Sequence, residues 1–355
     1  MRCLYFILLI FVLNSCSNEQ FNSDTYEDVN EENYNPVFLD LEIPSNFPEP
    51  TYPIDNNRPT QAGFELGKKL LYDGRLSSTG VISCGFCHIQ EFAFTHHTHM
   101  VSHGVNGALG TRNAPPLQNM IFLQSFNWDG SVAHLDMQPI VPITAEVEMN
   151  ESISSVLEKL QNDPAYVQLF NKAFENGTID TKNMLSAISQ FVMMMISADT
   201  KYDKVVRGEG STFTDVESQG KAVFEQKCSG CHAGALFTDN SYRNNGLPID
   251  LQYNDEGRKI VTGLEEDKYK FRVPTLRNIA VTFPYMHDGR FQSLRAVLDF
   301  YDSGVQNTQN LDPQLIQDEG SLGITLTEDE KDKIIAFLNT LTDDNFILDD
   351  RFSEF

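Results

Sequence analysis

Two short segments of one pattern decide how this chain is interpreted: Cys84-Gly85-Phe86-Cys87-His88 and Cys228-Ser229-Gly230-Cys231-His232. In each segment, two residues separate a pair of thiols and a histidine follows directly. These segments hold four of the six cysteines of the chain, and the other two are Cys3 and Cys16. Cys3 lies in an apolar N-terminal stretch, so the sequence leaves no cysteine for a structural disulfide.

A CxxCH segment has the spacing with which two thiols add to the vinyl groups of a haem. The histidine that follows then reaches the iron from the proximal side. A zinc site built from two CxxC pairs is one alternative, but it leaves both histidines unexplained. A thiol redox motif is the other, but it is not expected twice, each time with a histidine, behind an export leader. We therefore expect two covalent haems with His88 and His232 as proximal iron ligands.

Length and composition describe an acidic chain of ordinary hydrophobicity. It has 355 residues, 41% of them hydrophobic, with a formal net charge of -24 and a pI near 4.6. Such a charge argues against nucleic acid and anionic membrane as partners. It suits a basic protein partner, such as a small electron-donor cytochrome or a cupredoxin, although acidity that only maintains solubility is an equal alternative. A second copy of this chain, forming a homodimer, is a further candidate partner.

The N-terminal residues have the pattern of an export leader. Residues 1–15 place Arg2 before an apolar run and end in Leu13-Asn14-Ser15-Cys16, which resembles a bacterial lipoprotein cleavage box. A plain signal peptide cut near Cys16 is the alternative. Residues 16–35 are polar and acidic and read as a flexible tether. We expect a periplasmic protein that a lipid on Cys16 anchors to a membrane.

Apolar residues at helical spacing predict a mainly α fold. The stretch 127–150 contains prolines and reads as irregular, and Met193, Met194 and Met195 read as core filling. A capping-box pattern begins at Thr327. The predicted helices span residues 61–71, 152–161, 164–174, 181–197, 215–226, 294–301 and 327–341. Because each half shows a helix, a haem motif, a loop and further helices, we expect two domains, 36–210 and 211–355.

From about Gly67 to Leu341 the chain resembles the bacterial dihaem cytochrome c peroxidase and MauG family. The matching segments are residues 84–88, 112–115, 128–130, 138–149, 228–232, 273–278 and 284–289. Each segment is short, but several in the right order around two haem motifs are specific. The resemblance implies two cytochrome c-like domains whose haems lie near a shared interface, with a peroxidatic haem in the first and an electron-transfer haem in the second.

The resemblance also implies the catalytic residues of the first haem site. Cleavage of peroxide needs a group that moves a proton between its two oxygens, and a carboxylate can do this. In the family this group is a Glu ten residues after a Gln, with a Pro between them. Gln138, Pro142 and Glu148 fit that spacing. The alternative is that Glu148 only caps the helix that follows.

Many peroxidases of the family hold a distal His on the first haem at rest. Counting back from Gln138, that position is Val105, and valine cannot bind iron. A shifted loop could still supply one of His96, His97, His99 and His103, of which His103 is the nearest. Surface or metal-trapping roles are the alternatives for these histidines. We expect a first iron that is open without prior reduction.

The second haem needs a distal ligand as well. Family peroxidases use a Met fourteen residues after the His of a Tyr-x-His-x-Gly segment, and MauG has a Tyr there. From His287 that count gives Tyr301. Tyrosine is a known haem ligand, and its anionic oxygen favours ferric iron. Met286 is the rival ligand, and the alternative for Tyr301 is a packed aromatic side chain.

Two further roles rest on the resemblance alone. Trp128, the only tryptophan, matches the residue that lies between the haems and relays electrons; the alternative is a buried core aromatic, and both can hold at once. Asn113, Thr282 and Pro284 match the positions whose oxygens bind a calcium ion between the domains. Oxygen ligands, including backbone carbonyls, suit Ca²⁺, and the alternative is that these are ordinary loop residues.

These observations predict a haem peroxidase that reduces hydrogen peroxide to water with electrons from a small donor protein. A MauG-like oxidase that removes electrons from a protein substrate is the first alternative, and Tyr301 and Val105 favour it. A dihaem electron carrier without enzymatic activity is the second, and Gln138, Pro142 and Glu148 argue against it.

Overall fold

The computed structural model describes residues 34–354 of the chain. The predicted leader and Cys16 lie outside the described residues, as does nearly all of the predicted tether. No helix within residues 34–354 combines the length and the apolar character that crossing a membrane requires.

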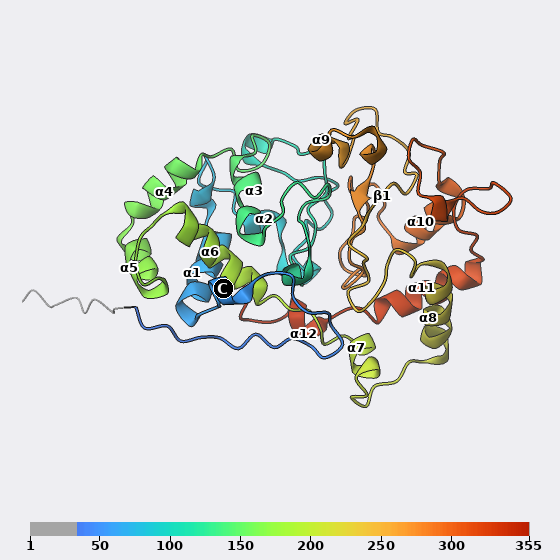
Figure 1. Cartoon of the computed structure of the whole chain (residues 1–355), viewed down its shortest axis with the longest axis horizontal. Helices are drawn as coiled ribbons and strands as arrows, with labels where there is room; N and C mark the ends of the chain where they lie inside the picture. Colours follow the sequence, from blue (N-terminus) through green and yellow to red (C-terminus); the bar gives the residue numbers. More distant parts are fainter. Residues whose placement is uncertain (1–33, 355) are drawn as a thin grey trace, which may run out of the picture. The chain divides into compact units, whose positions relative to one another are not determined.

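The described residues are mainly helical, as predicted (Figure 1). In the first half the α-helices are α1 (Gln61–Tyr72), α2 (Cys84–Cys87), α3 (Ile140–Thr144), α4 (Ile153–Gln161), α5 (Pro164–Ala173), α6 (Thr181–Met193) and α7 (Lys201–Val206). In the second half they are α8 (Asp215–Lys227), α9 (Lys259–Thr262), α10 (Leu294–Asp299), α11 (Glu328–Asn339) and α12 (Asp344–Ile347). The strands β1 (Tyr242–Arg243) and β2 (Phe271–Arg272) pair antiparallel, with Tyr242 opposite Arg272.

In each half, two of the longer helices cross at a glycine. α1 packs against α6, and α8 packs against α11. A Cβ atom on Gly67 of α1 would overlap the backbone oxygen of Ala187 on α6, and one on Gly220 of α8 would overlap the backbone oxygen of Lys333 on α11. Backbone cannot move aside as a flexible side chain can, so these crossings require glycine. The two halves therefore repeat one packing scheme, in which a helix ahead of the CxxCH segment crosses a later helix.

This close crossing gives a stability prediction for Gly220→Ala. Overpacking of a tight contact costs about 1–3 kcal/mol, so the free energy of unfolding should fall by that amount. The measurement is urea denaturation of the haem-loaded protein. Gln219→Ala, an exposed change on the same helix, is the control and should stay within about 0.5 kcal/mol. Equal midpoints for both variants would contradict the crossing.

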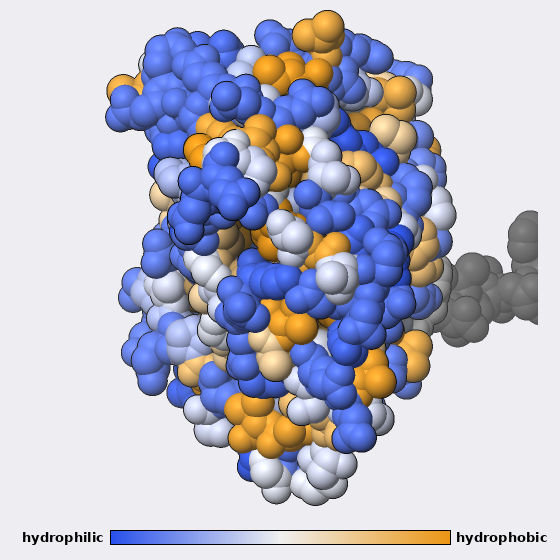
Figure 2. Space-filling model, turned by 90° about the vertical axis from the view of Figure 1, so that its right-hand side faces the viewer, coloured by the Kyte–Doolittle hydropathy of each residue, from blue (hydrophilic) through white to orange (hydrophobic). Residues whose placement is uncertain are grey.

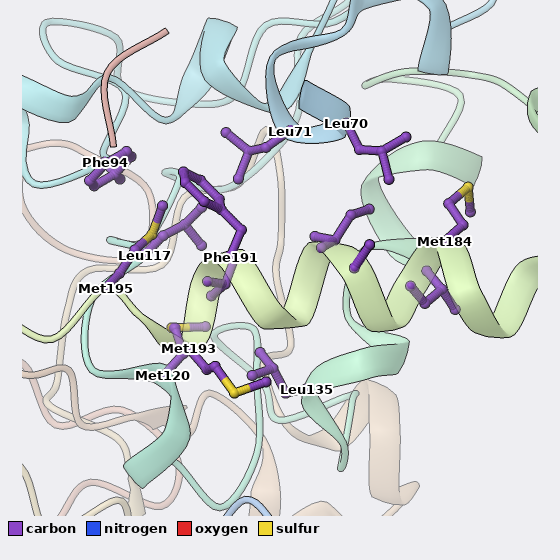
Figure 3. Packing of buried hydrophobic residues seen from close by; sticks show 14 of the residues in the cluster. Leu70, Leu71, Phe94, Leu117, Met120, Leu135, Met184, Phe191, Met193 and Met195 are labelled. Carbon is purple, nitrogen blue, oxygen red and sulfur yellow. The ribbon is translucent and has the colours of Figure 1, made fainter. Parts of the chain in front are cut away.

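The largest hydrophobic core lies around α6 (Figure 3). Met193 and Met195 are fully buried there, which confirms core filling for these two methionines, and Met194 packs at the edge of the cluster. Phe346 and Phe352, from the C-terminal end of the chain, belong to the same cluster. The last described residues therefore complete the core of the first half.

Buried polar contacts join the two halves. The guanidinium of Arg277 and the carboxylate of Asp203 are 2.7 Å apart, and neither side chain is exposed. Gln118 donates from Nε2 to the carbonyl of Arg277 at 2.7 Å. The described residues therefore form one compact unit. The division into domains 36–210 and 211–355 stays a prediction.

The structure corrects three secondary-structure predictions. Residues 127–150 are not wholly irregular, because α3 forms there with Pro142 in its first turn, where proline is tolerated. α6 ends at Met193 rather than at residue 197, since Asn119 holds the backbone of Ser197 through two hydrogen bonds. α10 ends at Asp299, and residues 300–304 continue as a π-helical turn.

Candidate active site

Both CxxCH segments fold into the same short turn. The amide of His88 donates to the carbonyl of Cys84 at 2.9 Å, and the amide of His232 donates to the carbonyl of Cys228 at 3.0 Å. One helical turn thus carries both cysteines and presents the histidine at its end. In the second half the turn follows α8 directly. In the first half a loop separates α1 from the turn, which begins at Cys84.

A backbone carbonyl fixes each motif histidine through Nδ1. Nδ1 of His88 lies 2.7 Å from the carbonyl oxygen of Phe94, and Nδ1 of His232 lies 3.2 Å from that of Phe237. Both phenylalanines have positive φ, 61° and 53°, which is uncommon for a bulky residue and marks a constrained backbone. With Nδ1 donating to a carbonyl, Nε2 is left to bind a metal.

Burial lowers the pKa of both imidazoles, against the opposing effect of the carbonyl hydrogen bonds. His88 and His232 are therefore neutral at pH 7, which is the form that binds iron.

The four thiols are held in their protonated form. Burial raises the pKa of Cys84 to about 12, of Cys87 to about 11 and of Cys228 to about 12, and it also raises the pKa of Cys231. A reactive redox thiol usually has a lowered pKa, so these shifts do not favour the thiol redox alternative. Within residues 34–354 no three His, Cys, Asp or Glu side chains are grouped to hold a metal ion, so the zinc alternative has no support there.

Glu148 lies at the first CxxCH turn. Its charge acts on both Cys84 and Cys87, which places the carboxyl near these thiols. Burial raises the pKa of Glu148, and a hydrogen bond with Ser102 partly opposes this effect. The backbone carbonyl of Glu148 accepts from the amide of Val105 at 2.8 Å. The position that a distal histidine would occupy is thus a buried valine beside Glu148.

Pro142 lies in α3, and Gln138 lies in the turn before that helix. The amide of Met149 donates to the carbonyl of Pro142 at 3.1 Å, so the chain folds back and brings Glu148 next to the helix. Nε2 of Gln138 lies 3.4 Å from Oδ1 of Asn127, the neighbour of Trp128. Among the described residues no hydrogen bond joins Gln138 to Glu148.

Three of the loop histidines pack together. The ring of His96 stacks on His99 with centroids 4.2 Å apart, and the ring of His103 lies 4.3 Å from that of His99. Burial and the neighbouring histidines His99, His103 and His88 lower the pKa of His96 to about 4. His97 points elsewhere and stacks on Phe92. None of these contacts assigns an iron-binding role to the cluster.

At the second CxxCH turn, both predicted distal ligands meet one residue. Nδ2 of Asn245 lies 3.5 Å from Sδ of Met286, and the side chain of Asn245 also lies close enough to the phenol of Tyr301 to lower its pKa against the effect of burial. Burial raises the pKa of Tyr301 to about 12, and the thiols of Cys228 and Cys231 act on it electrostatically. Tyr301 lies in the π-helical turn, a form often found at functional sites. The choice between Tyr301 and Met286 stays a prediction in favour of Tyr301.

Trp128 links the two halves. Its indole Nε1 donates to the carbonyl of Asn113 at 2.8 Å, and its own carbonyl accepts from the amide of Arg272 in β2 at 2.7 Å. The side chain is half-buried and lines a hollow that both halves form. The place of Trp128 between the haems and its relay role both stay predictions.

Comparisons with known proteins agree with this site. The sequence profile of the family described as di-haem cytochrome c peroxidase matches residues 61–211. The chain is 34% identical to the methylamine utilization protein MauG of Methylorubrum extorquens over 78% of this chain and 77% of that protein.

The chain belongs to the dihaem cytochrome c peroxidase and MauG family. It is 32% identical to the cytochrome c551 peroxidase of Pseudomonas aeruginosa over 78% of each chain. A crystal structure of a MauG-like protein associated with microbial copper homeostasis superimposes with a TM-score of 0.80 and 31% identity, covering 89% of this chain and 99% of that one. As a member of this family, the chain is a haem peroxidase-type oxidoreductase.

The residues present fit two haems. Each CxxCH turn provides two unpaired cysteines and a neutral histidine whose Nδ1 is already held by a carbonyl. Cys84, Cys87 and His88 would hold one haem, and Cys228, Cys231 and His232 the other. Covalent attachment through the cysteines remains an inference from this fit.

The predicted calcium residues lie near one another in part. The amide of Asn113 donates to the carbonyl of His287 at 2.7 Å, which brings Asn113 to the segment that follows Thr282 and Pro284. The carbonyl of Asn113, however, already accepts from Trp128. Calcium binding stays a prediction.

Sequence reasoning missed several residues at these sites. Asn245 and Ser102 touch the proposed ligand and acid groups, and the carbonyls of Phe94 and Phe237 orient the motif histidines. The only sequence signal for the two phenylalanines is their place, six residues after His88 and five after His232.

Proposed function

We propose that this chain reduces hydrogen peroxide to water and takes the two electrons from a small redox protein. Haem, when bound, supplies an iron that exchanges single electrons and binds an oxygen ligand. The observation that supports the proposal is the carboxyl of Glu148 beside the first CxxCH turn, buried enough that its pKa is raised. A carboxyl group of this kind is a suitable general acid–base for moving a proton between the two peroxide oxygens.

The protein residues then have separate tasks. The carboxylate of Glu148 accepts the proton of one peroxide oxygen and returns it to the other oxygen, which leaves as water. Val105 is apolar and 2% exposed, so the residue at this position would not itself compete with peroxide for the iron. Two electrons and two further protons complete the reduction of one peroxide to two waters.

The electron donor is proposed from charge. The net charge of -24 attracts a basic protein. Figure 2 shows that hydrophilic residues cover most of the face around α8 and α10, with hydrophobic residues in small separate patches. A hydrophilic surface of this kind on an acidic chain suits a transient encounter with a small cytochrome or cupredoxin. We place this encounter in the periplasm, with the chain tethered by a lipid on Cys16.

The test combines spectroscopy with turnover. The oxidised protein should show one high-spin and one low-spin haem by electron paramagnetic resonance. Adding hydrogen peroxide and a reduced basic small cytochrome should oxidise two donors for each peroxide, more slowly at high salt. Two low-spin haems without donor oxidation would refute the peroxidase proposal and support the electron carrier.

A second candidate is a MauG-like oxidase that takes electrons from a protein substrate. The buried Tyr301 at the second CxxCH turn favours it, together with the likeness to MauG and to the MauG-like protein of copper homeostasis. In this case the ferric protein should take up two oxidising equivalents from one peroxide and hold them without a donor. Small reduced cytochromes should then be oxidised slowly or not at all.

A further inference from the structure

Arg272 is a buried arginine without a partner. Arg272 is 7% exposed, and its Nε atom forms no hydrogen bond. Within residues 34–354 no ion pair reaches its guanidinium, and the only charge effect on it comes from Tyr242. Burying an unpaired cation is costly, so a group that is not part of the polypeptide is expected to face it.

Two other arginines show what is missing. The guanidinium of Arg277, which is 0% exposed, is bound by both oxygens of Asp203 at 2.7 and 2.8 Å. Arg112, whose side chain is 21% exposed, is bound by Asp129 and Asp255. Carboxylate oxygens thus match the guanidinium of the fully buried Arg277 and that of the partly buried Arg112, and Arg272 lacks such a match.

The surroundings of Arg272 indicate where a carboxylate would come from. Arg272 lines a hollow together with Trp128, Leu236, Thr238, Pro274 and Thr275. Leu236 and Thr238 follow His232 closely, and the carbonyl of Pro274 lies close enough to the His232 ring to affect it. The hollow therefore adjoins the second CxxCH turn, where the covalent haem would bring its own carboxylates.

We propose that Arg272 is the counter-cation of a propionate of the haem attached at Cys228 and Cys231. The forked N–H groups of a guanidinium bind a carboxylate with two parallel hydrogen bonds. The backbone of Arg272 already bonds Trp128, so one residue ties the haem edge to the tryptophan at the junction of the two halves. This inference rests on the fit of the second haem and not on peroxide chemistry.

The pairing also sets the reduction potential of that haem. An unneutralised propionate close to the iron favours the ferric state, and Arg272 removes that preference. In Arg272→Gln the one-electron equilibrium of the low-spin haem should shift at least tenfold toward ferric, which is about 59 mV. The measurement is spectroelectrochemical titration of the haem-loaded protein without peroxide, so it is independent of whether the proposed peroxidase activity exists.

The matched control is Arg258→Gln. Arg258 stacks over the ring of Tyr242, the residue opposite Arg272 in the strand pair, with its guanidinium 3.8 Å from the ring centroid. Its side chain is 27% exposed, so water screens its charge. Removing the same charge there should shift the equilibrium less than threefold.

Arg272→Lys separates charge from geometry. It keeps the cation but loses the fork, so the midpoint should stay within threefold of wild type while the propionate bending band in resonance Raman spectra moves. This variant also decides the matter if Arg272→Gln matures poorly. Equal shifts for the Arg272 and Arg258 glutamine variants, a shift confined to the haem on His88, or an unmoved propionate band in the lysine variant would overturn the proposal.

Discussion

Glu148→Gln should lower peroxide-dependent turnover by about 10²- to 10⁴-fold, the range expected when a general acid–base group is lost. The amide keeps the size of the side chain but cannot accept a proton from peroxide. The measurement is kcat for donor oxidation under saturating peroxide, together with the haem spectra. The spectra should be unchanged, because Glu148 is not expected to bind iron at rest.

The dependence of turnover on pH should reflect the titration of Glu148. Burial raises the pKa of Glu148 above the usual value for a glutamate, which is about 4.3. Glu148 therefore loses the carboxylate form that catalysis needs at a higher pH than an exposed glutamate would. Activity of the wild type should therefore fall on acidification through that raised value, and the acidic limb should be missing in Glu148→Gln. Glu146→Gln, an exposed change two residues away, is the control and should keep both rate and profile. Loss of less than threefold in Glu148→Gln would reject the assigned role.

Tyr301→Phe should change the iron ligation of the second haem. If Tyr301 binds the iron, its loss removes an anionic ligand that favours ferric iron, and the midpoint potential should rise by more than a tenfold equilibrium shift, about 59 mV. The low-spin electron paramagnetic resonance signal should be replaced. Met286, which shares Asn245 with Tyr301, is positioned to take over as ligand.

Met286→Leu supplies the comparison. In the wild-type background this change should leave the low-spin signal in place, whereas adding it to Tyr301→Phe should leave the second iron without a side-chain ligand and high-spin. The opposite pattern, with the signal lost in Met286→Leu and kept in Tyr301→Phe, would show that methionine is the ligand.

Much of the helical fold could be predicted because its signals are local. The helices that precede the two CxxCH turns begin where the sequence predicts, at Gln61 and Asp215. The predicted capping box at Thr327 forms with Glu330. Periodic apolar residues and helix caps depend on residues only a few positions apart, so they can be recognised in the sequence.

The features that the sequence did not reveal depend on distant partners. Asn245 lies in a loop without a motif, and only the fold brings it between Met286 and Tyr301. The sequence also cannot show that Arg272 lacks a partner, because this depends on which carboxylates the fold places near its guanidinium. The length of α6 was overestimated because hydrogen bonds from Asn119 to Ser197 override local helix preference.

Phe346 and Phe352 support the loop that orients His88, although they lie far from it in the sequence. Phe94, whose carbonyl holds that histidine, packs its ring against Phe346 and Phe352, and Tyr72 donates to the carbonyl of Phe352 at 2.7 Å. The first CxxCH segment is synthesised well before these supporting side chains. Contacts of such long sequence separation form late in folding. A haem joined to Cys84 and Cys87 before the later half of the chain has folded would therefore meet a half-finished binding site, which closes around it only when Phe346 and Phe352 pack against Phe94.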